Sequence, residues 1–207
     1  MNVLVLAPHP DDECIGCGGA LCLHAKRNDR ISVVFLTSGE LGLKHLPPDQ
    51  AWSIREAEAH AASKILGISD LTFLRCSDWT LADDLHKAAD LLQPILIRTK
   101  PELIYLPHPN DGHPDHQATL PILRAAWEGT ELSAPQLRAY EVWTPLTHYD
   151  HVEDITSVMP KKLEALRAHK SQLQDFDYVR AITGLNEYRG VLAGKCQHAE
   201  VFQDLAL

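Results

Sequence analysis

The stretch Asn2-Val3-Leu4-Val5-Leu6-Ala7 opens the chain with an apolar run, and Val33-Val34-Phe35-Leu36, within residues 31–36, is a second such run. Strands that are apolar without alternation are typical of a parallel sheet with helices on both faces. Three more short apolar stretches, near residues 71–75, 102–106 and 138–143, alternate with longer segments of helical periodicity. This alternation indicates successive β-α-β units. The sequence therefore predicts an α/β, Rossmann-like fold of three layers around a mostly parallel central sheet.

Five helices are expected between and after these strands, near residues 15–28, 52–66, 83–98, 115–127 and 159–170. The second of them is predicted to end at Leu66, because Gly67 can adopt the left-handed conformation that closes a helix. A chain of 207 residues has the usual size of one domain, so residues 1–207 are expected to form a single domain.

The charge and cysteine content narrow the expected partners and compartment. Lys and Arg number 19 against 28 Asp and Glu, a net charge of −9, and aromatic residues make up 6% of the chain. Such a composition repels phosphate backbones and anionic lipids, so nucleic acid and membrane surfaces are not expected partners. No apolar stretch approaches the roughly 18 residues of a membrane span. Five irregularly spaced cysteines suit a reducing compartment, and the first residues do not resemble a signal peptide. We therefore expect a cytoplasmic protein.

An acidic turn follows the first expected strand. Ala7-Pro8-His9-Pro10-Asp11-Asp12-Glu13 places one imidazole and three carboxylates at the start of a helix. A helix N-terminus can stabilise one or two carboxylates, but not three beside a histidine. A divalent cation would relieve the remaining repulsion, and His9 and Asp12 stand three residues apart, a spacing suited to binding one ion.

A histidine-rich turn follows the fourth expected strand. Pro107-His108-Pro109-Asn110-Asp111-Gly112-His113-Pro114-Asp115-His116 leads into a helix with Pro114 suited to its first position. Loops that leave the carboxyl ends of parallel strands line one crevice, so His113 and His116 are expected to face the turn that carries His9. Two histidines, one aspartate and a fourth position for water describe a catalytic zinc site, and similar divalent ions suit the same ligands.

Other interpretations remain open on the residues alone. The aspartates can be helix caps and turn residues, and an ion can merely stiffen the two loops. A metal-dependent phosphoesterase would need a second metal site and basic phosphate clamps, which the sequence does not assemble. The glycine-rich segment 16–19 would need a small residue in place of Leu21 to form a dinucleotide-binding turn. Cys14 and Cys17 lack a second cysteine pair and are predicted to pack in the core.

Taken together, Pro8-His9-Pro10-Asp11-Asp12-Glu13, Gly16-x-Gly18-Gly19 and His113-Pro114-Asp115-His116 resemble the PIG-L/LmbE family of zinc-dependent N-acetylglucosaminyl deacetylases. Further matches are Thr37-Ser38-Gly39-Glu40, Arg55-x-x-Glu58, Asp154-Ile155-Thr156 and the stretch from Lys162 to Gln172. The resemblance covers nearly the whole chain and is weakest after residue 175.

The resemblance implies roles for six residues of the two turns. One zinc ion would be bound by His9, Asp12 and His116. Asp11 would be the general base that takes a proton from water, an assignment that spacing alone does not make between the two neighbouring aspartates. A protonated His113 would stabilise the oxyanion and help to protonate the leaving amine, and Asp115 would hold the His113 ring in orientation.

Four substrate contacts are also implied by the resemblance. Arg55 would reach an anionic or hydroxyl-bearing part of the substrate, and Glu40 and Asp78 would bind sugar hydroxyls, while His169 could approach the site. On the residues alone, Arg55 can instead form an exposed helix pair with Glu58, and His169 can be a cation at a helix end.

The activity that the resemblance implies is hydrolytic removal of the acetyl group from an N-acetylglucosamine-type amino sugar or its conjugate, a small molecule. The alternatives are an amidase that cleaves a larger acyl group from a sugar-thiol conjugate, and a non-catalytic sugar-binding protein of the same fold. The short chain also suggests that a partner copy in a homo-oligomer helps to close the cleft.

Overall fold

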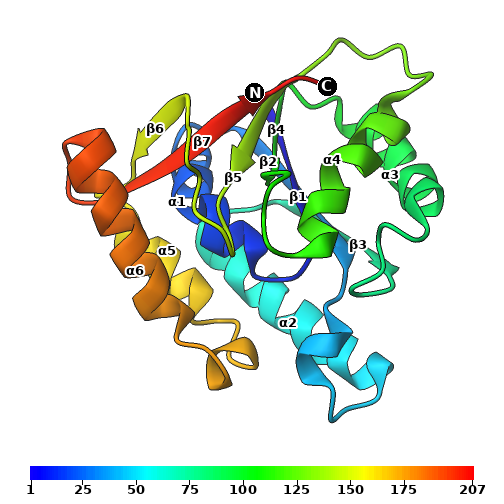
Figure 1. Ribbon diagram of the computed structural model, residues 1–207, viewed down its shortest axis with the longest axis horizontal. Coiled ribbons are helices and arrows are strands. Elements are labelled where there is room, and N and C mark those ends of the chain that lie inside the picture. Colours follow the sequence, from blue (N-terminus) through cyan, green and yellow to red (C-terminus); the bar gives the residue numbers. More distant parts are fainter.

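A seven-stranded sheet forms the centre of the computed structural model, which describes residues 1–207 (Figure 1). Its strands are β1 (Asn2–Ala7), β2 (Arg30–Thr37), β3 (Asp70–Cys76), β4 (Leu103–Pro107), β5 (Gln136–Tyr140), β6 (His151–Asp154) and β7 (Ala199–Leu205). They lie in the order β3-β2-β1-β4-β5-β7-β6. Strands β1 to β5 are mutually parallel, whereas β7 is antiparallel to both of its neighbours. The predicted α/β class with a mostly parallel sheet is confirmed.

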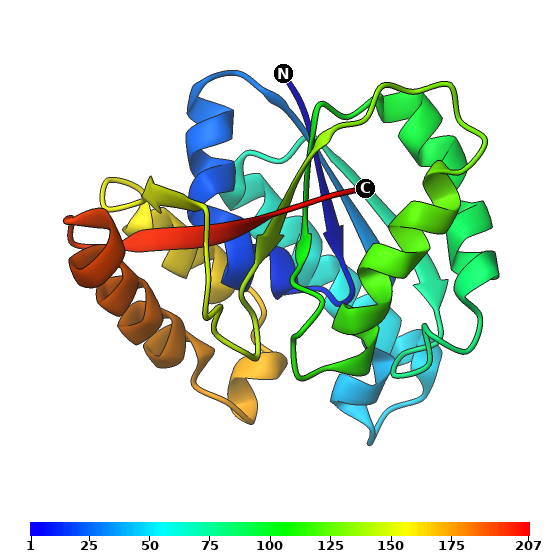
Figure 2. The same ribbon diagram turned by 45° about the horizontal axis from the view of Figure 1, so that its top comes forward.

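Helices cover both faces of this sheet. They are α1 (Asp12–Lys26), α2 (Pro48–Leu66), α3 (Leu85–Thr99), α4 (Pro114–Trp127), α5 (Met159–Leu166) and α6 (Tyr178–Arg189), with short helical turns at Glu40–Leu43, Gln172–Gln174 and Gly190–Gly194. Helices α3 and α4 pack together on one face, and α1, α2 and α5 pack together on the other (Figures 1 and 2). Three layers result, as expected.

Strand β1 shows why its sequence is continuously apolar. Val3, Val5 and Ala7 belong to the core beneath α1 and α2, whereas Leu4 and Leu6 belong to the core beneath α3 and α4. All five are at most 2% exposed. Successive side chains of a strand point to opposite faces, so a strand with both faces covered needs apolar residues at every position.

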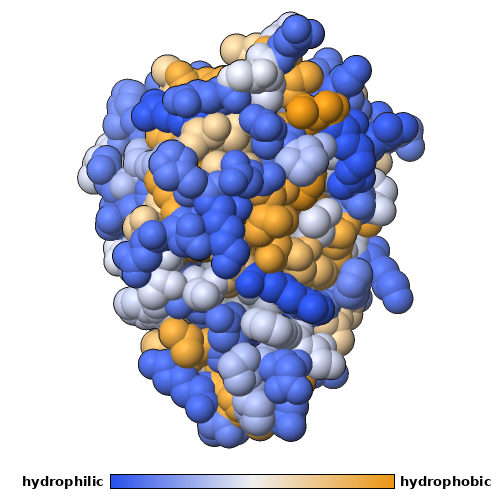
Figure 3. All heavy atoms as spheres, turned by 90° about the vertical axis from the view of Figure 1, so that its right-hand side faces the viewer, coloured by the Kyte–Doolittle hydropathy of each residue, from blue (hydrophilic) through white to orange (hydrophobic).

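The outer surface of the face formed by α3 and α4 carries apolar patches bordered by polar side chains (Figure 3). Leu91 and Ile97 of α3 are among the exposed apolar residues. None of the helices combines the length and the apolar character that crossing a bilayer requires.

The C-terminal third departs from the expected elements. The sequence pattern predicts neither β6, β7 nor α6, because β6 is a four-residue strand of alternating exposure and β7 pairs with strands distant in the chain. The strand expected at 138–143 runs from Gln136 to Tyr140, where parallel pairing with β4 sets its register. The helix expected at 159–170 ends at Leu166, since the following N–H groups bond three residues back and tighten the chain into a turn.

A buried ion pair clamps α1 to the C-terminal part of the chain. The Nζ atom of Lys162 lies 2.7 Å from Oε1 of Glu200 and donates to the Ile15 carbonyl, while Glu200 accepts the Gly19 N–H at 2.8 Å. In a regular helix the Gly19 N–H would donate to the Ile15 carbonyl. Here the ion pair engages both of these groups instead. A Cβ at Gly19 would lie 2.5 Å from the Ile155 side chain. The absence of a side chain at Gly19 therefore allows close packing of α1 beneath the acidic turn.

Candidate active site

The acidic turn with His9 and the histidine-rich turn with His116 lie where the strand order reverses. The chain builds β2 and β3 on one side of β1 and then crosses to β4 on its other side. The turns after β1 and β4 therefore run in opposite directions and line a crevice between them at the carboxyl edge of the sheet. This is the usual ligand position in such folds. A pocket of about 460 Å³ opens there, lined by His9, Asp11, Asp12 and His113 among others. Its volume falls within the range of about 300–1,000 Å³ that is typical of small-molecule sites.

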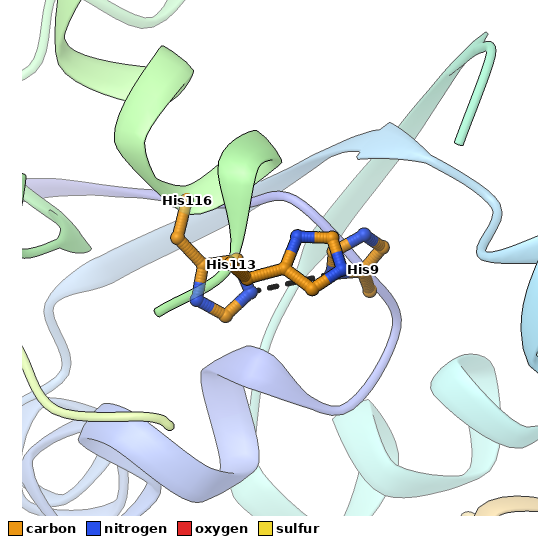
Figure 4. A group of neighbouring side chains, drawn as sticks. All are labelled: His9, His113 and His116. Carbon is orange, nitrogen blue, oxygen red and sulfur yellow. Dashed lines mark hydrogen bonds between the residues drawn. The ribbon is translucent and has the colours of Figure 1, made fainter. Parts of the chain in front are cut away.

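Three ligand atoms form a nearly equilateral triangle in this crevice. Nδ1 of His9 lies 3.2 Å from Oδ2 of Asp12 and 3.3 Å from Nε2 of His116, and the latter two atoms are 3.3 Å apart. Figure 4 shows the contact between His9 and His116, with the His113 ring beside them. Ligand bonds of about 2.0–2.1 Å in a tetrahedral zinc site place neighbouring ligand atoms about 3.3 Å apart. The donor set and its spacing thus fit one zinc ion.

Carboxylates stand behind both histidines of the triangle. Nε2 of His9 lies 3.1 Å from Oδ1 of Asp78 and 3.2 Å from Oδ2 of Asp115, and Nδ1 of His116 lies 3.0 Å from Oδ1 of Asp111. A carboxylate on the second ring nitrogen sets the tautomer that leaves the first one free to bind a metal. Each imidazole is therefore oriented as a metal ligand by the fold itself.

These same carboxylates hold protons on the histidines when no metal is bound. Burial lowers the pKa of His9, but hydrogen bonds with Asp115, Asp12 and Asp78 outweigh it and raise this pKa well above its ordinary value. Burial likewise opposes protonation of His116, yet the neighbouring carboxylates raise its pKa to about 9. A bound cation would take the place of these protons.

Asp11 sits at the N-terminus of α1 in a strained conformation. Its φ angle of 131° lies in a region that side-chain-bearing residues rarely adopt. Glu13 accepts its N–H at 3.1 Å, and Arg55 donates to the Pro10 carbonyl beside it. Burial raises the pKa of Asp11 to about 6, although the Arg55 guanidinium, 3.4 Å from Oδ2, acts to lower it. Asp11 thus has a pKa suited to taking up and returning a proton near neutral pH.

His113 is the N-cap of α4, and its hydrogen bonds select one tautomer. Its Nδ1 accepts the Asp115 N–H at 3.2 Å, so the neutral ring carries its hydrogen on Nε2. Burial lowers the pKa of His113, and the charges of His9 and His116 lower it further. In this arrangement a neutral His113 ring can donate from Nε2, and the protonated His113 that the family resemblance implies stays a prediction. The contact expected between Asp115 and this ring is made by the main chain, not by the carboxylate.

The carboxylate of Asp115 instead joins two parts of the site. It accepts the N–H groups of Trp79 and Leu81, at 2.7 and 3.1 Å, in addition to its contact with His9. Asp115 therefore ties the loop after β3 to a metal ligand.

Arg55 lines the pocket as expected, but its guanidinium is 3% exposed and already engaged. It donates to the carbonyls of Gly39 and Pro10 and lies beside Asp11. The alternative of an exposed pair with Glu58 is wrong, because the Glu58 carboxylate accepts the N–H and hydroxyl of Ser171. The position of Arg55 favours control of Asp11 over direct contact with substrate.

Asp78 and Glu40 have partners other than the sugar hydroxyls expected for them. Oδ2 of Asp78 accepts the Leu41 N–H at 3.0 Å, while Oδ1 faces His9. Glu40 accepts the Asp78 N–H with one oxygen and the Trp52 indole N–H with the other, each at 3.1 Å. Both carboxylates therefore brace the loops around the metal ligands.

His169 is fully buried and does not line the pocket. Its Nε2 lies 3.6 Å from Oε1 of Glu13 and 3.6 Å from the Cys14 thiol. The substrate contact implied for His169 is not formed in this arrangement, because the start of α1 places Glu13 and Cys14 against the ring. Cys14 and Cys17 are both buried, in agreement with the predicted core packing.

Sequence reasoning missed Asp111 and the aromatic mouth of the pocket. The sequence suggests a cap or turn role for Asp111, although its position five residues before His116, within one tight turn, is a usable signal for a role beside the histidine. Phe176 lies in the region where the family resemblance is weakest, so no motif pointed to it. Trp79 and Trp143 belong to neither metal-turn motif, and both line the pocket.

Comparison with known protein families shows to which family the chain belongs. Residues 4–127, which contain both metal-binding turns, match the PIG-L family model, described as GlcNAc-PI de-N-acetylase. The chain belongs to the PIG-L family. The activity in the family's description, de-N-acetylation, is hydrolysis of an amide bond, and the relationship predicted from the motifs is confirmed.

Individual relatives agree with this placement. The probable N-acetyl-alpha-D-glucosaminyl L-malate deacetylase 2 of Bacillus subtilis is 32% identical over 185 residues, which cover 84% of each chain. The N,N'-diacetylchitobiose deacetylase of Pyrococcus horikoshii shares the fold, with a TM-score of 0.85, 24% identity and coverage of 98% of this chain and 83% of its own. The 4-carboxy-2-hydroxymuconate hydratase GalB of Pseudomonas putida also superposes, with a TM-score of 0.82, 26% identity and coverage of 100% and 97%.

Proposed function

We propose that this protein is a zinc-dependent deacetylase of an N-acetylglucosamine-type amino sugar conjugate. One observation carries the proposal: the triangle of His9, Asp12 and His116 opens on the same pocket as the carboxylate of Asp11 and the ring of His113. The deacetylase relative that acts on an N-acetylglucosaminyl malate supports the substrate class. The hydratase GalB, which has the same fold, shows that the reaction has to be argued from the site and not from the fold.

His9, Asp12 and His116 would hold the zinc ion, which when bound would supply a Lewis acid for the acetamide carbonyl and would make water more acidic. Asp11 takes a proton from the attacking water, a step to which a pKa of about 6 is suited. The Nε2–H of His113 donates to the carbonyl oxygen as negative charge develops on it. Asp11 then returns the proton to the nitrogen as the C–N bond breaks, which yields acetate and a free amine.

The strain at Asp11 and the hydrogen bonds around it serve this chemistry. A residue fixed in an unfavourable conformation persists only where its surroundings determine it, and such residues concentrate at active sites. Glu13 and Arg55 both hold the Pro10–Asp11 peptide bond, Glu13 at its N–H and Arg55 at its carbonyl, so the Asp11 carboxylate is positioned before substrate binds.

The test is release of acetate and amine from a panel of N-acetylglucosamine conjugates by wild-type and Asp11→Asn protein, each with its zinc content measured. We expect both proteins to hold one zinc ion per chain, with turnover lower by about 10²–10⁴-fold in the variant. Equal activity of Asp11→Asn would remove Asp11 from its role. Absence of turnover by zinc-loaded wild type would contradict the deacetylase proposal, and preference for longer acyl groups in the same panel would favour the amidase alternative.

A further inference from the structure

We propose that Glu13, Cys14 and His169 form a second metal site, which lies buried behind the acidic turn and binds one zinc ion as the chain folds. These residues are separate from the three ligands of the pocket triangle, and none of them lines the pocket. The ion would therefore have a structural role, and the site does not depend on the proposed deacetylase function.

Three ligand atoms of different kinds meet in this cluster. Oε1 of Glu13 lies 3.2 Å from Sγ of Cys14, and Nε2 of His169 lies 3.6 Å from each of these two atoms. Around a tetrahedral zinc ion, bonds of about 2.3 Å to sulfur and about 2.0–2.2 Å to nitrogen or oxygen place the ligand atoms about 3.3–3.7 Å apart. The three side chains could therefore close on one zinc ion with shifts of a few tenths of an ångström.

The ring of His169 is poorly satisfied by hydrogen bonds within the protein. Its Nδ1 has no hydrogen-bond partner, and its Nε2 is too far from the Glu13 carboxylate for a hydrogen bond. The Cys14 thiol, which is within reach of Nε2, donates to Glu13 instead. Burying a polar ring without good partners is unfavourable. A zinc ion between the three side chains would give Nε2 a strong partner.

The donor types select the metal. Thiolate, imidazole and carboxylate are all ligands of zinc, whereas magnesium and calcium prefer oxygen ligands alone. Cys17, one turn further along α1, offers a comparison within the same helix. Its thiol is also buried, but it contacts the main-chain carbonyl of Glu13 and belongs to no group of metal-ligand atoms. The neighbouring histidine and carboxylate thus distinguish Cys14 as a ligand.

An ion in this site would hold the acidic turn from behind. The two carboxylate oxygens of Glu13 have different neighbours: Oε1 belongs to the proposed ligand set, while Oε2 accepts the Asp11 N–H at 3.1 Å. His169 follows α5 and lies 155 residues beyond Cys14 in the sequence. The ion would therefore join the start of α1 to the segment after α5 and fix the carboxylate that holds Asp11.

Burial determines when the ion can enter. Glu13, Cys14 and His169 are fully buried, so zinc added to the folded protein meets the pocket triangle first and has no open route to these side chains. During folding the same side chains are accessible, and the Cys14 thiol passes its proton to the buffer as the ion binds. The one zinc ion per chain expected for protein loaded after folding is thus the ion of the pocket triangle. Refolding with metal should add a second ion.

The experiment follows cobalt, which replaces zinc and reports on its ligands. The full chain is unfolded with denaturant, reductant and chelator, and is then refolded either with Co²⁺ or without metal. Unbound metal is removed and the bound ions are counted. A thiolate ligand gives cobalt a near-ultraviolet charge-transfer band that imidazole and carboxylate ligands do not give. Wild type refolded with Co²⁺ should hold two ions and show the band. Wild type given Co²⁺ after folding should hold one ion and show no band.

Two variants of buried cysteines provide the matched comparison. Cys14→Ala refolded with Co²⁺ should lose the band and one ion, whereas Cys17→Ala should keep both. His169→Gln should also lose the second ion, because it removes the imidazole ligand and leaves the thiol in place.

Absence of the band from wild type refolded with Co²⁺ would overturn the site, as would a band that survives in Cys14→Ala or is lost in Cys17→Ala. A band that develops when Co²⁺ is added to the folded protein would overturn binding during folding. X-ray absorption of wild type refolded with zinc requires no substitution. It should show a sulfur ligand at about 2.3 Å, and a spectrum without sulfur would overturn the site even if Cys14→Ala fails to fold.

Discussion

The carboxylate of Glu13 accepts the backbone N–H of Asp11 at 3.1 Å, directly at the residue whose φ angle is 131°. The other oxygen of Glu13 lies 3.2 Å from the Cys14 thiol and 3.6 Å from His169. Glu13, Cys14 and His169 are all fully buried. The strained turn is thus held from inside the protein by a network that does not reach the pocket.

Replacement of Glu13 should therefore reduce activity without removing a substrate contact. We expect Glu13→Ala to lower kcat at least tenfold with KM nearly unchanged, because Asp11 loses the bond that fixes its position. The free energy of unfolding should fall by about 1–3 kcal/mol, the cost of a buried polar group without a partner. Steady-state kinetics and urea unfolding measure both effects. Glu13→Gln, which keeps a carbonyl oxygen, is the matched control, and equal losses in both variants would argue against this role.

Arg55 should control the pH dependence of activity through Asp11. In the proposed mechanism Asp11 acts when ionised, so activity should rise with pH through its pKa, and the Arg55 cation acts to lower that pKa. Arg55→Gln removes the cation, so the acid limb of log(kcat/KM) should move to higher pH. Arg55→Lys keeps a positive charge and should shift the limb less. Profiles measured at saturating zinc test the direction, and a shift to lower pH in Arg55→Gln would refute it.

Asp111 should contribute to metal affinity although it is not a ligand. Its carboxylate orients the His116 ring from a distance of 3.0 Å, and loss of such a partner typically weakens metal binding by about 10–100-fold. We expect this loss in Asp111→Asn by competition with a zinc chelator. Asp90→Asn, at an exposed position of α3, is the control. Wild-type affinity in Asp111→Asn would show that the fold orients His116 without the carboxylate.

Metal binding should release protons from the two histidine ligands. The pKa of His116 is raised to about 9 and that of His9 well above its ordinary value, so both rings are protonated at neutral pH in the metal-free protein. Zinc binds the deprotonated rings, so its affinity should rise with pH up to about 9 and fall in acid. Calorimetry in buffers of different ionisation enthalpy should show release of about two protons at pH 7. Release of none would mean that the rings are neutral before binding.

Substitutions of Lys162 and Glu200 should have strongly coupled effects on the free energy of unfolding. Lys162→Met leaves the Glu200 carboxylate buried without its cation, and Glu200→Gln leaves the cation without its anion. Breaking a buried pair typically costs about 3–5 kcal/mol, whereas removing both charges costs less than the sum. Urea unfolding of the two single variants and the double variant measures the coupling. Additive losses would show that the two charges act independently.

Local sequence was sufficient for the elements that position the site. The continuously apolar strands β1, β2 and β4 predict a covered parallel sheet, since both faces of such strands need apolar residues. His9 with Asp12, and His113 with His116, lie within single turns, so their grouping needed little knowledge of distant contacts. The PIG-L family relationship and the α/β class followed from these short stretches.

Only the tertiary structure decided which groups surround the metal ligands. Asp78 faces His9, and Glu40 accepts the Asp78 N–H, because β3 and the turn after β2 are brought together, and this apposition depends on sheet order. Asp115 contacts a histidine 106 residues away with its side chain and a neighbouring histidine with its backbone. β7 likewise pairs with distant strands, which no local pattern reports. Sequence periodicity determines which faces are buried, whereas long-range packing determines which polar groups meet across the crevice.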